Sequence, residues 1–90
     1  PRDGLQNEPG VIPTADKVRL VELLRSSGVD EIEVTSFVSA KWVPQLGDAS
    51  DVCAGVAGLA PLGGTTHGSG PVLSALVPTE RGMQGALAAN

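Results

Sequence analysis

Residues 18–37 have the sequence VRLVELLRSSGVDEIEVTSF, and this stretch decides the fold. Apolar residues recur at helical spacing as far as Leu24, and Gly28 follows at a position where helices commonly end. Ile32 and Val34 then alternate with polar residues, a period of two that predicts a strand. A helix followed at once by a short strand is typical of a βαβ unit, and therefore of a parallel sheet.

The residues before this stretch supply the start of the helix and a polar loop. We expect the helix to span 14–27, with Thr14 as its N-cap and Asp16 in the first turn, where a carboxylate complements the helix dipole. Glycine and proline punctuate residues 1–13, which predicts a loop. Within it, the segment PRDG at 1–4 is interpreted as the tail of a preceding strand.

Beyond the strand, the pattern predicts a second helix and a long connection. A helical stripe of apolar residues runs from Val43 to Val56, with Pro44 tolerated in its first turn and Trp42 expected to anchor its start. Residues 58–70 are rich in Gly, Ser and Thr, which predicts a flexible surface connection.

A third strand and a last helix complete the order. The segment PVLSALVP at 71–78 has a proline at each end and predicts a strand, and Thr79 is expected to cap a helix from about residue 80. Three parallel strands alone would leave bare edges and an uncovered face. Because a (β/α)₈ barrel takes about 250 residues, we expect residues 1–90 to be the N-terminal fragment of a single TIM-barrel domain. The predicted fold class is α/β, a partial (β/α)₈ TIM barrel of about the first three βα units with parallel strands.

The composition excludes several kinds of partner. The 90 residues carry a net charge of −4 and six lysines and arginines, so no basic stripe can neutralise nucleic-acid phosphates. No apolar run approaches the roughly 20 residues that span a bilayer, and no signal peptide is visible, so we expect no membrane partner. The single cysteine, Cys53, favours a reducing compartment such as the cytoplasm. Since residue 1 is not Met, a targeting segment could precede it.

Polar residues fall where the carboxyl ends of the strands are expected, and TIM barrels place their active sites at those ends. Arg2 and Asp3 follow the first expected strand, and Glu33, Thr35 and Ser36 lie along and after the second. If the apolar neighbours of Glu33 pack against the helices, its carboxylate must face the barrel interior, where a charge is costly unless it is paired. Arg2 is the obvious partner, which leaves Asp3 free to bind a hard cation such as Mg²⁺ or Mn²⁺.

Each of these features also has a plainer interpretation. An Arg–Asp pair before a glycine is commonly a solvated turn, and a glutamate in mid-strand commonly lies on an exposed face. His67 is interpreted as a loop residue, and Cys53 as a small buried hydrophobe rather than a nucleophile. The glycines at 58–70 match no phosphate-loop pattern. The residues alone leave a functional site and a structural role both open.

Three distinctive sequence motifs are more informative than residue spacing: RDGLQNE at 2–8, IEVTSFVS at 32–39 and KWVPQ at 41–45. From Pro1 to about Asp48, the chain closely resembles the N-terminal part of the 3-hydroxy-3-methylglutaryl-CoA lyase family. The final SALVPTERGMQGALAAN resembles the family's third strand and helix more loosely, since family members usually have Asn where Thr79 stands. The stretch GGTTHGSG looks like a local insertion.

The resemblance implies a metal-dependent TIM-barrel lyase that cleaves 3-hydroxy-3-methylglutaryl-CoA to acetyl-CoA and acetoacetate, in leucine degradation and ketone-body metabolism. It implies a divalent metal cofactor, Mg²⁺ or Mn²⁺, an acyl-CoA substrate and a homodimer in the full-length family. The implied location is the bacterial cytoplasm or the mitochondrial matrix, of which the cytoplasm is preferred.

The same resemblance implies a role for each candidate residue. Arg2 matches the catalytic arginine that binds substrate and stabilises the developing enolate oxygen, and Asp3 matches a metal ligand. Glu33 matches a catalytic acid that orients the arginine and the metal site. Gln6 and Ser36 match substrate-binding positions. A fixed guanidinium suits this chemistry, because it supplies positive charge where the enolate forms.

Other equipment of the family has no counterpart in the 90 residues: an H-x-H pair and an asparagine as further metal ligands, and a cysteine in a glycine-rich loop. We therefore expect no lyase activity from this chain by itself. Two alternatives stay open at this point. One is a related Claisen-type acyl-CoA synthase, similar to isopropylmalate or homocitrate synthase, and the other is a non-catalytic remnant.

Overall fold

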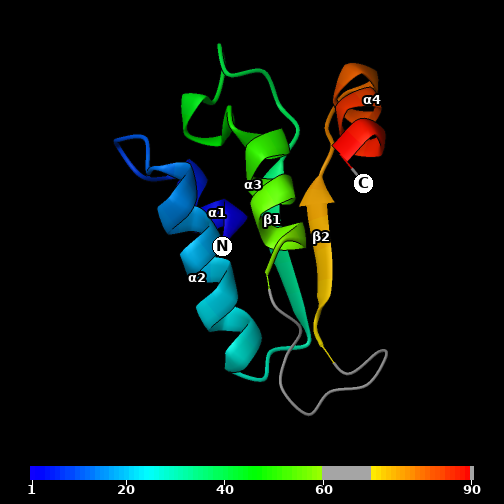
Figure 1. Cartoon of the computed structure of the whole chain (residues 1–90). Coiled ribbons are helices and arrows are strands. Elements are labelled where there is room, and N and C mark those ends of the chain that lie inside the picture. Colours follow the sequence, from blue (N-terminus) through cyan, green and yellow to red (C-terminus); the bar gives the residue numbers. More distant parts are fainter. Residues whose placement is uncertain (60–69, 90) are drawn as a thin grey trace.

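Two parallel strands form the centre of the fold, as the order of helix and strand predicts. The computed structural model describes residues 1–59 and 70–89. Strand β1 (Glu31–Ser36) pairs in parallel with β2 (Val72–Leu76), and the two lie side by side in Figure 1. The pairing carries an irregularity between Glu33 and Thr35. The chain is therefore an α/β structure, and the expected parallel sheet is confirmed over these two strands.

Helix α2 (Thr14–Ser26) begins at the predicted residue and ends within one residue of the prediction, but its N-cap differs. Pro13 occupies the N-cap position, so the expectation that Thr14 caps the helix is wrong. The Thr14 hydroxyl instead donates a hydrogen bond to Asp48 Oδ2 at 2.5 Å. Gly28 follows the helix with a φ of +88°, a left-handed conformation that only glycine adopts at low cost.

The predicted second helix is divided in two. A short 3₁₀ helix, η1 (Pro44–Leu46), precedes α3 (Ala49–Ala57), and Pro44 stands in the first turn of η1, where its missing N–H costs nothing. The expectation that Trp42 anchors this region is wrong, because its side chain is 77% exposed. Leu46 is the buried anchor instead, at 1% exposed.

The first residues differ most from expectation. The segment PRDG is not the tail of a strand, because helix α1 (Arg2–Gln6) includes three of its four residues. The Leu5 amide donates to the Pro1 carbonyl at 3.0 Å, and this turn buries the Leu5 side chain. The described residues therefore hold two strands rather than the three expected.

The last helix begins where the sequence predicts. Helix α4 (Glu80–Ala89) is capped by Thr79, whose Oγ1 accepts a hydrogen bond from the Gly82 amide at 3.0 Å. A side chain at Gly82 would place its Cβ 2.2 Å from the Phe37 carbonyl oxygen, so this position has room only for glycine. Both β2 and α4 carry exposed apolar side chains, Val72, Leu73 and Leu76 on the strand and Met83 and Leu87 on the helix.

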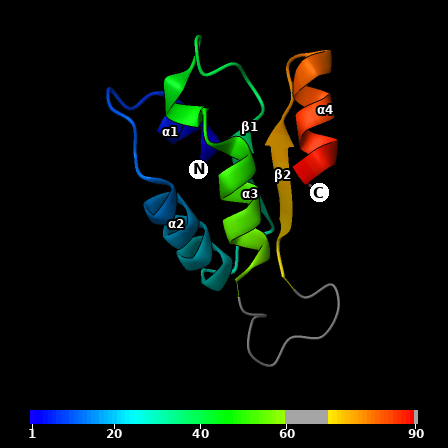
Figure 2. The same ribbon diagram turned by 45° about the horizontal axis from the view of Figure 1, so that its top comes forward.

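The core lies between β1 and the two helices α2 and α3, which cover one face of it (Figures 1 and 2). Its members are buried aliphatic side chains from these three elements: Val21, Ile32, Val34, Val52 and Val56. Each such side chain contributes about 1.5–3 kcal/mol when fully buried. Because successive side chains of a strand alternate between faces, Glu33 projects away from this core.

Two expectations concern other parts of the chain. Most of the predicted connection at 58–70 lies outside the described residues, and so does His67. Among the helices of the described part, none is long and apolar enough to cross a membrane.

The exchange of roles between Trp42 and Leu46 gives a direct test. Leu46→Ala should lower the free energy of unfolding by about 2–5 kcal/mol, because it opens a cavity at a fully buried site. Trp42→Ala should change it by no more than about 0.5 kcal/mol, as expected for an exposed side chain. Urea unfolding followed by circular dichroism measures both, and equal losses for the two variants would contradict the structure.

Candidate active site

A charged pair joins α1 to the middle of β1. The Arg2 Nε–H donates to Glu33 Oε1 at 2.5 Å, across 31 residues of sequence. The Arg2 side chain is 18% exposed and that of Glu33 is 38% exposed, so the pair is partly screened by solvent. The expected partnership of these two residues is confirmed, and Glu33 does not stand alone on a bare face.

Two further candidates come from the same short helix. Gln6 lies four residues after Arg2, one helical turn on, and its Oε1 accepts a hydrogen bond from Arg2 Nη1 at 2.8 Å. The Asp3 carboxylate lies 3.8 Å from the same nitrogen, and its side chain is 84% exposed. The structure thus gathers Arg2, Asp3, Gln6 and Glu33 into one cluster, in which the guanidinium is held from two sides.

The end of β1 adds two hydroxyl groups. Ser36, the remaining predicted site residue, is buried at the last position of the strand, and no hydrogen bond or ion pair joins it to Arg2 within the described ranges. Thr35 is buried beside it, and its Oγ1 has no hydrogen-bond partner among the described residues. A buried hydroxyl without a partner is uncommon, so this observation supports Thr35, which the sequence already places near the end of the strand, as a candidate residue. Its only signal in the sequence is its place on the strand two residues after Glu33.

The cluster does not make a metal site from its own residues. Asp3 offers one exposed carboxylate, whereas a hard divalent cation takes about six oxygen ligands, several of them from the protein. Over residues 1–59 and 70–89, no group of three or more His, Cys, Asp or Glu side chains is arranged to hold a metal ion. Asp3 can therefore supply one ligand of such a site and not the site itself.

The environment of the cysteine agrees with a structural role rather than that of a nucleophile. Cys53 is half-buried on α3, and this burial raises the pKa of its thiol. A thiol with a raised pKa is a poor nucleophile at neutral pH, since the thiolate is the reactive form.

A second network of polar groups fastens α2 to the segment before α3. The Lys17 ammonium donates to Asp48 Oδ1 at 2.6 Å and to the Gln45 carbonyl oxygen at 2.5 Å, and the Thr14 hydroxyl binds the other oxygen of Asp48. Burial alone would raise the pKa of Asp48, but the hydrogen bonds from Lys17 and Thr14 outweigh it and hold the pKa below its ordinary value.

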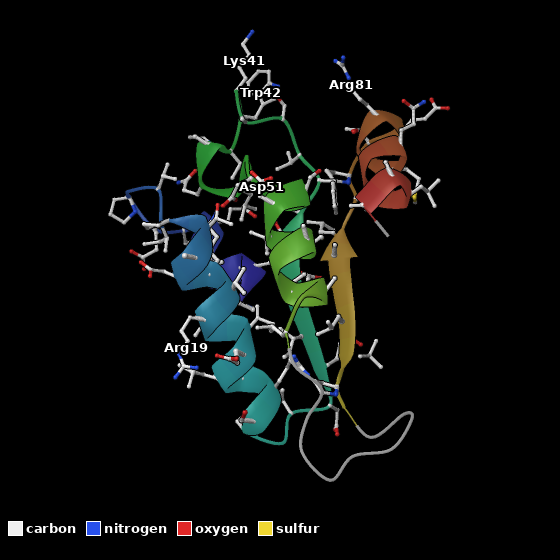
Figure 3. The ribbon with its side chains drawn as sticks, viewed as in Figure 1. Arg19, Lys41, Trp42, Asp51 and Arg81 are labelled. Atoms are coloured by element: carbon white, nitrogen blue, oxygen red, sulfur yellow. The ribbon has the colours of Figure 1, made fainter. Side chains whose placement is uncertain are left out.

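A groove of about 590 Å³ lies near the carboxyl ends of the strands, apart from the charged cluster. Its lining comes from the loop after β1 and the first turns of α3 and α4, and includes neither Arg2 nor Glu33. Figure 3 shows Trp42 and Arg81 at the same end of the molecule, both above Asp51 in this view, with Lys41 beside Trp42. The charged cluster, which holds four of the five predicted site residues and not Ser36, remains the candidate active site.

Comparisons with known proteins show which proteins the chain resembles. No protein-family model matches the chain. A curated relative, the mitochondrial hydroxymethylglutaryl-CoA lyase of Arabidopsis thaliana, is 48% identical over 89 residues, which is 99% of this chain and 17% of that protein. The crystal structure of the HMG-CoA lyase from Brucella melitensis superposes with a TM-score of 0.81 at 46% identity, over 98% of this chain and 28% of that one.

The chain belongs to the hydroxymethylglutaryl-CoA lyase family. Another member, an HMG-CoA lyase from Acinetobacter baumannii solved in complex with coenzyme A and 3-methylmalate, matches with a TM-score of 0.83 at 38% identity. That match covers 100% of this chain and 27% of the other. The chain therefore spans between 17% and 28% of the length of these three relatives. Its helices and parallel strands correspond to one part of their structures.

The pKa of Asp48 leads to a prediction about acid stability. Its folded-state pKa is lowered, so the stability that it contributes is complete above its unfolded pKa of about 3.9 and is lost as the pH falls through the lower folded value. We expect the free energy of unfolding to fall below about pH 4 and Asp48→Asn to remove part of that slope. Asp48→Asn should also cost stability at pH 7, because it leaves the Lys17 ammonium without its counter-charge.

Urea unfolding between pH 2 and pH 7 measures both effects. Asp51→Asn is the matched control, since Asp51 is an exposed aspartate of the neighbouring turn. An acid slope that is the same in Asp48→Asn as in the unmodified chain would refute the prediction.

Proposed function

We propose that the chain is part of a metal-dependent carbon–carbon lyase that cleaves 3-hydroxy-3-methylglutaryl-CoA to acetyl-CoA and acetoacetate. The observation that carries the proposal is the Arg2–Glu33 pair, formed at 2.5 Å on the core-free face of β1 in a chain of this family. We further propose that β1 and β2 belong to a TIM barrel, so that this face is the barrel interior.

Arg2 is the residue proposed to stabilise the negative charge that develops during the reaction. Cleavage of the carbon–carbon bond between the tertiary alcohol carbon and the carbon next to the thioester carbonyl leaves an enolate. Positive charge fixed beside the enolate oxygen lowers the barrier. A guanidinium carries five N–H donors, of which the structure uses one on Nε and one on Nη1. The remaining donors are available to an anionic oxygen of the substrate. Because the ion pair and the Gln6 contact already hold the group, little reorganisation is needed when the charge develops.

Glu33 and Gln6 are proposed to aim this guanidinium. The carboxylate of Glu33 holds Nε, and the amide oxygen of Gln6 holds Nη1, so two of the three nitrogens are fixed before substrate binds. In addition, we propose that Gln6 and Ser36 contact the substrate. Thr35 supplies a buried hydroxyl close to Ser36 in the strand.

We propose that Mg²⁺ or Mn²⁺ is a cofactor of the longer protein, with Asp3 as one of its ligands. The described residues do not complete such a site, so no step of the reaction is assigned to the metal from this chain. An acyl-CoA substrate, a homodimer and a location in the cytoplasm or the mitochondrial matrix belong to the same proposal. For the 90-residue chain taken alone, the incomplete donor set favours a second candidate, a polypeptide without catalysis.

Turnover by a complete barrel that contains this segment tests the proposal. Such a protein should release acetyl-CoA from 3-hydroxy-3-methylglutaryl-CoA in the presence of Mg²⁺ or Mn²⁺, and Arg2→Gln should lower kcat by about 100- to 1000-fold. Arg19→Gln is the control, because Arg19 lies on the outer side of α2, where it pairs with Glu22 (Figure 3). Full kcat in the Arg2→Gln variant, or condensation of acetyl-CoA with a 2-oxo acid in place of cleavage, would reject the proposed function.

Metal binding by the 90-residue chain provides a separate prediction. With one carboxylate ligand, Mn²⁺ should bind with a Kd of roughly 1 mM or weaker, and Asp3→Asn should abolish what binding there is. Electron paramagnetic resonance of free Mn²⁺ measures the bound fraction. Saturable binding in the micromolar range would show that the chain holds more ligands than the structure assigns to it.

A further inference from the structure

Lys17 is a charged residue almost completely withdrawn from water. It is 2% exposed, and its ammonium lies against two acceptors, Asp48 Oδ1 at 2.6 Å and the Gln45 carbonyl oxygen at 2.5 Å. Burying an ammonium is costly unless such partners compensate it. An apolar residue at this position would avoid that cost, so the lysine calls for an explanation beyond filling space.

The contacts of Lys17 continue toward the charged cluster. It holds the backbone of Gln45 in η1, and the side chain of Gln45 donates from Nε2 to the Glu8 carbonyl oxygen at 2.8 Å. Glu8 in turn donates its amide hydrogen to the Leu5 carbonyl oxygen at 3.3 Å, at the end of α1. Two side chains, Lys17 and Gln45, thus connect the rigid helix α2 to the short helix that carries Arg2.

Helix α1 depends on such external support. It has five residues, and isolated helices shorter than about 12 residues are marginal in water. Within the described residues, its attachments also include the buried side chain of Leu5 and the Arg2–Glu33 pair itself. An ion pair with one partner 38% exposed cannot fix a helix alone, because solvent screens it.

We propose that Lys17 is a positioning residue: through Gln45 and Glu8 it fixes α1 so that the Arg2 guanidinium stays in register with Glu33. The inference rests on the proposed function in one respect, since it assumes that the position of Arg2 matters for catalysis. Displacements of about 1 Å in an active site can cost on the order of a hundredfold in rate, which makes a remote anchor effective.

The test measures the environment of the Arg2 side chain and not the rate of catalysis. The ¹H–¹⁵N resonance of Arg2 Nε in the 90-residue chain reports the hydrogen bond to Glu33, both by its chemical shift and by its rate of hydrogen exchange at low temperature. Gln45→Ala removes the link to Glu8 and keeps the backbone carbonyl that Lys17 binds. The double variant Lys17→Met/Asp48→Asn removes the anchor and leaves no unpaired buried charge.

Both variants should speed exchange of the Arg2 Nε hydrogen by roughly fivefold to tenfold, the net contribution of one hydrogen bond, and shift its resonance toward that of a solvated arginine. Val56→Ala is the control for loss of stability, because it truncates a core residue that takes no part in the contacts from Lys17 through Gln45 to Glu8. Arg19→Ala is the control for loss of a surface charge on α2. Neither control should move the Arg2 resonance while the chain stays folded.

An unchanged Arg2 resonance in folded Gln45→Ala would overturn the proposal. So would an equal change in Val56→Ala, since that would mark Lys17 as a contributor to stability only. If the double variant does not fold, the result for Gln45→Ala decides. Failure of the lyase assay would leave these signals unaffected, so the two proposals can fail separately.

Discussion

The charge on the Glu33 carboxylate requires a cationic partner, and this requirement determines where α1 lies. The carboxylate projects from the middle of β1, between Ile32 and Val34, which are committed to the core. A charge at such a place needs a partner, and Arg2 is the partner that the fold provides. For the pair to form, α1 must cross the face of β1 that the long helices leave uncovered. One residue of a strand thereby determines the path of a segment about thirty positions earlier in the chain.

The elements that could be predicted are those whose pattern is local. Helix α2, strand β1 and helix α4 each show a clear period, and Gly28 and Thr79 mark two of their ends as expected. Helix α1 could not be predicted, because five residues contain no period and its stability comes from contacts with η1 and β1. Thr14 failed as a cap for a similar reason, since its hydroxyl is used by Asp48, 34 residues away.

A site residue could be predicted from the sequence where its apolar neighbours showed that a charge would be placed beside the core. Glu33 lies between apolar neighbours, so its need for a cation follows from the sequence. Lys17 gives no such signal, because a lysine beside a helical stripe ordinarily points to solvent, and its two acceptors lie 28 and 31 residues away. Trp42 misled for the opposite reason. Its size suggests an anchor, yet the compact Leu46 fills that place.

Strand β2 has consequences for handling the polypeptide. In the described part of the chain it pairs on one side only, with β1, and its exposed side chains include Val72, Leu73 and Leu76. An unpaired strand edge of this kind is a template on which further strands can add. No proline interrupts it between residues 72 and 76, and no lysine there discourages such growth. Expressed without a neighbouring strand, the polypeptide would present this edge to other copies of itself, so we expect it to aggregate through strand pairing as its concentration rises.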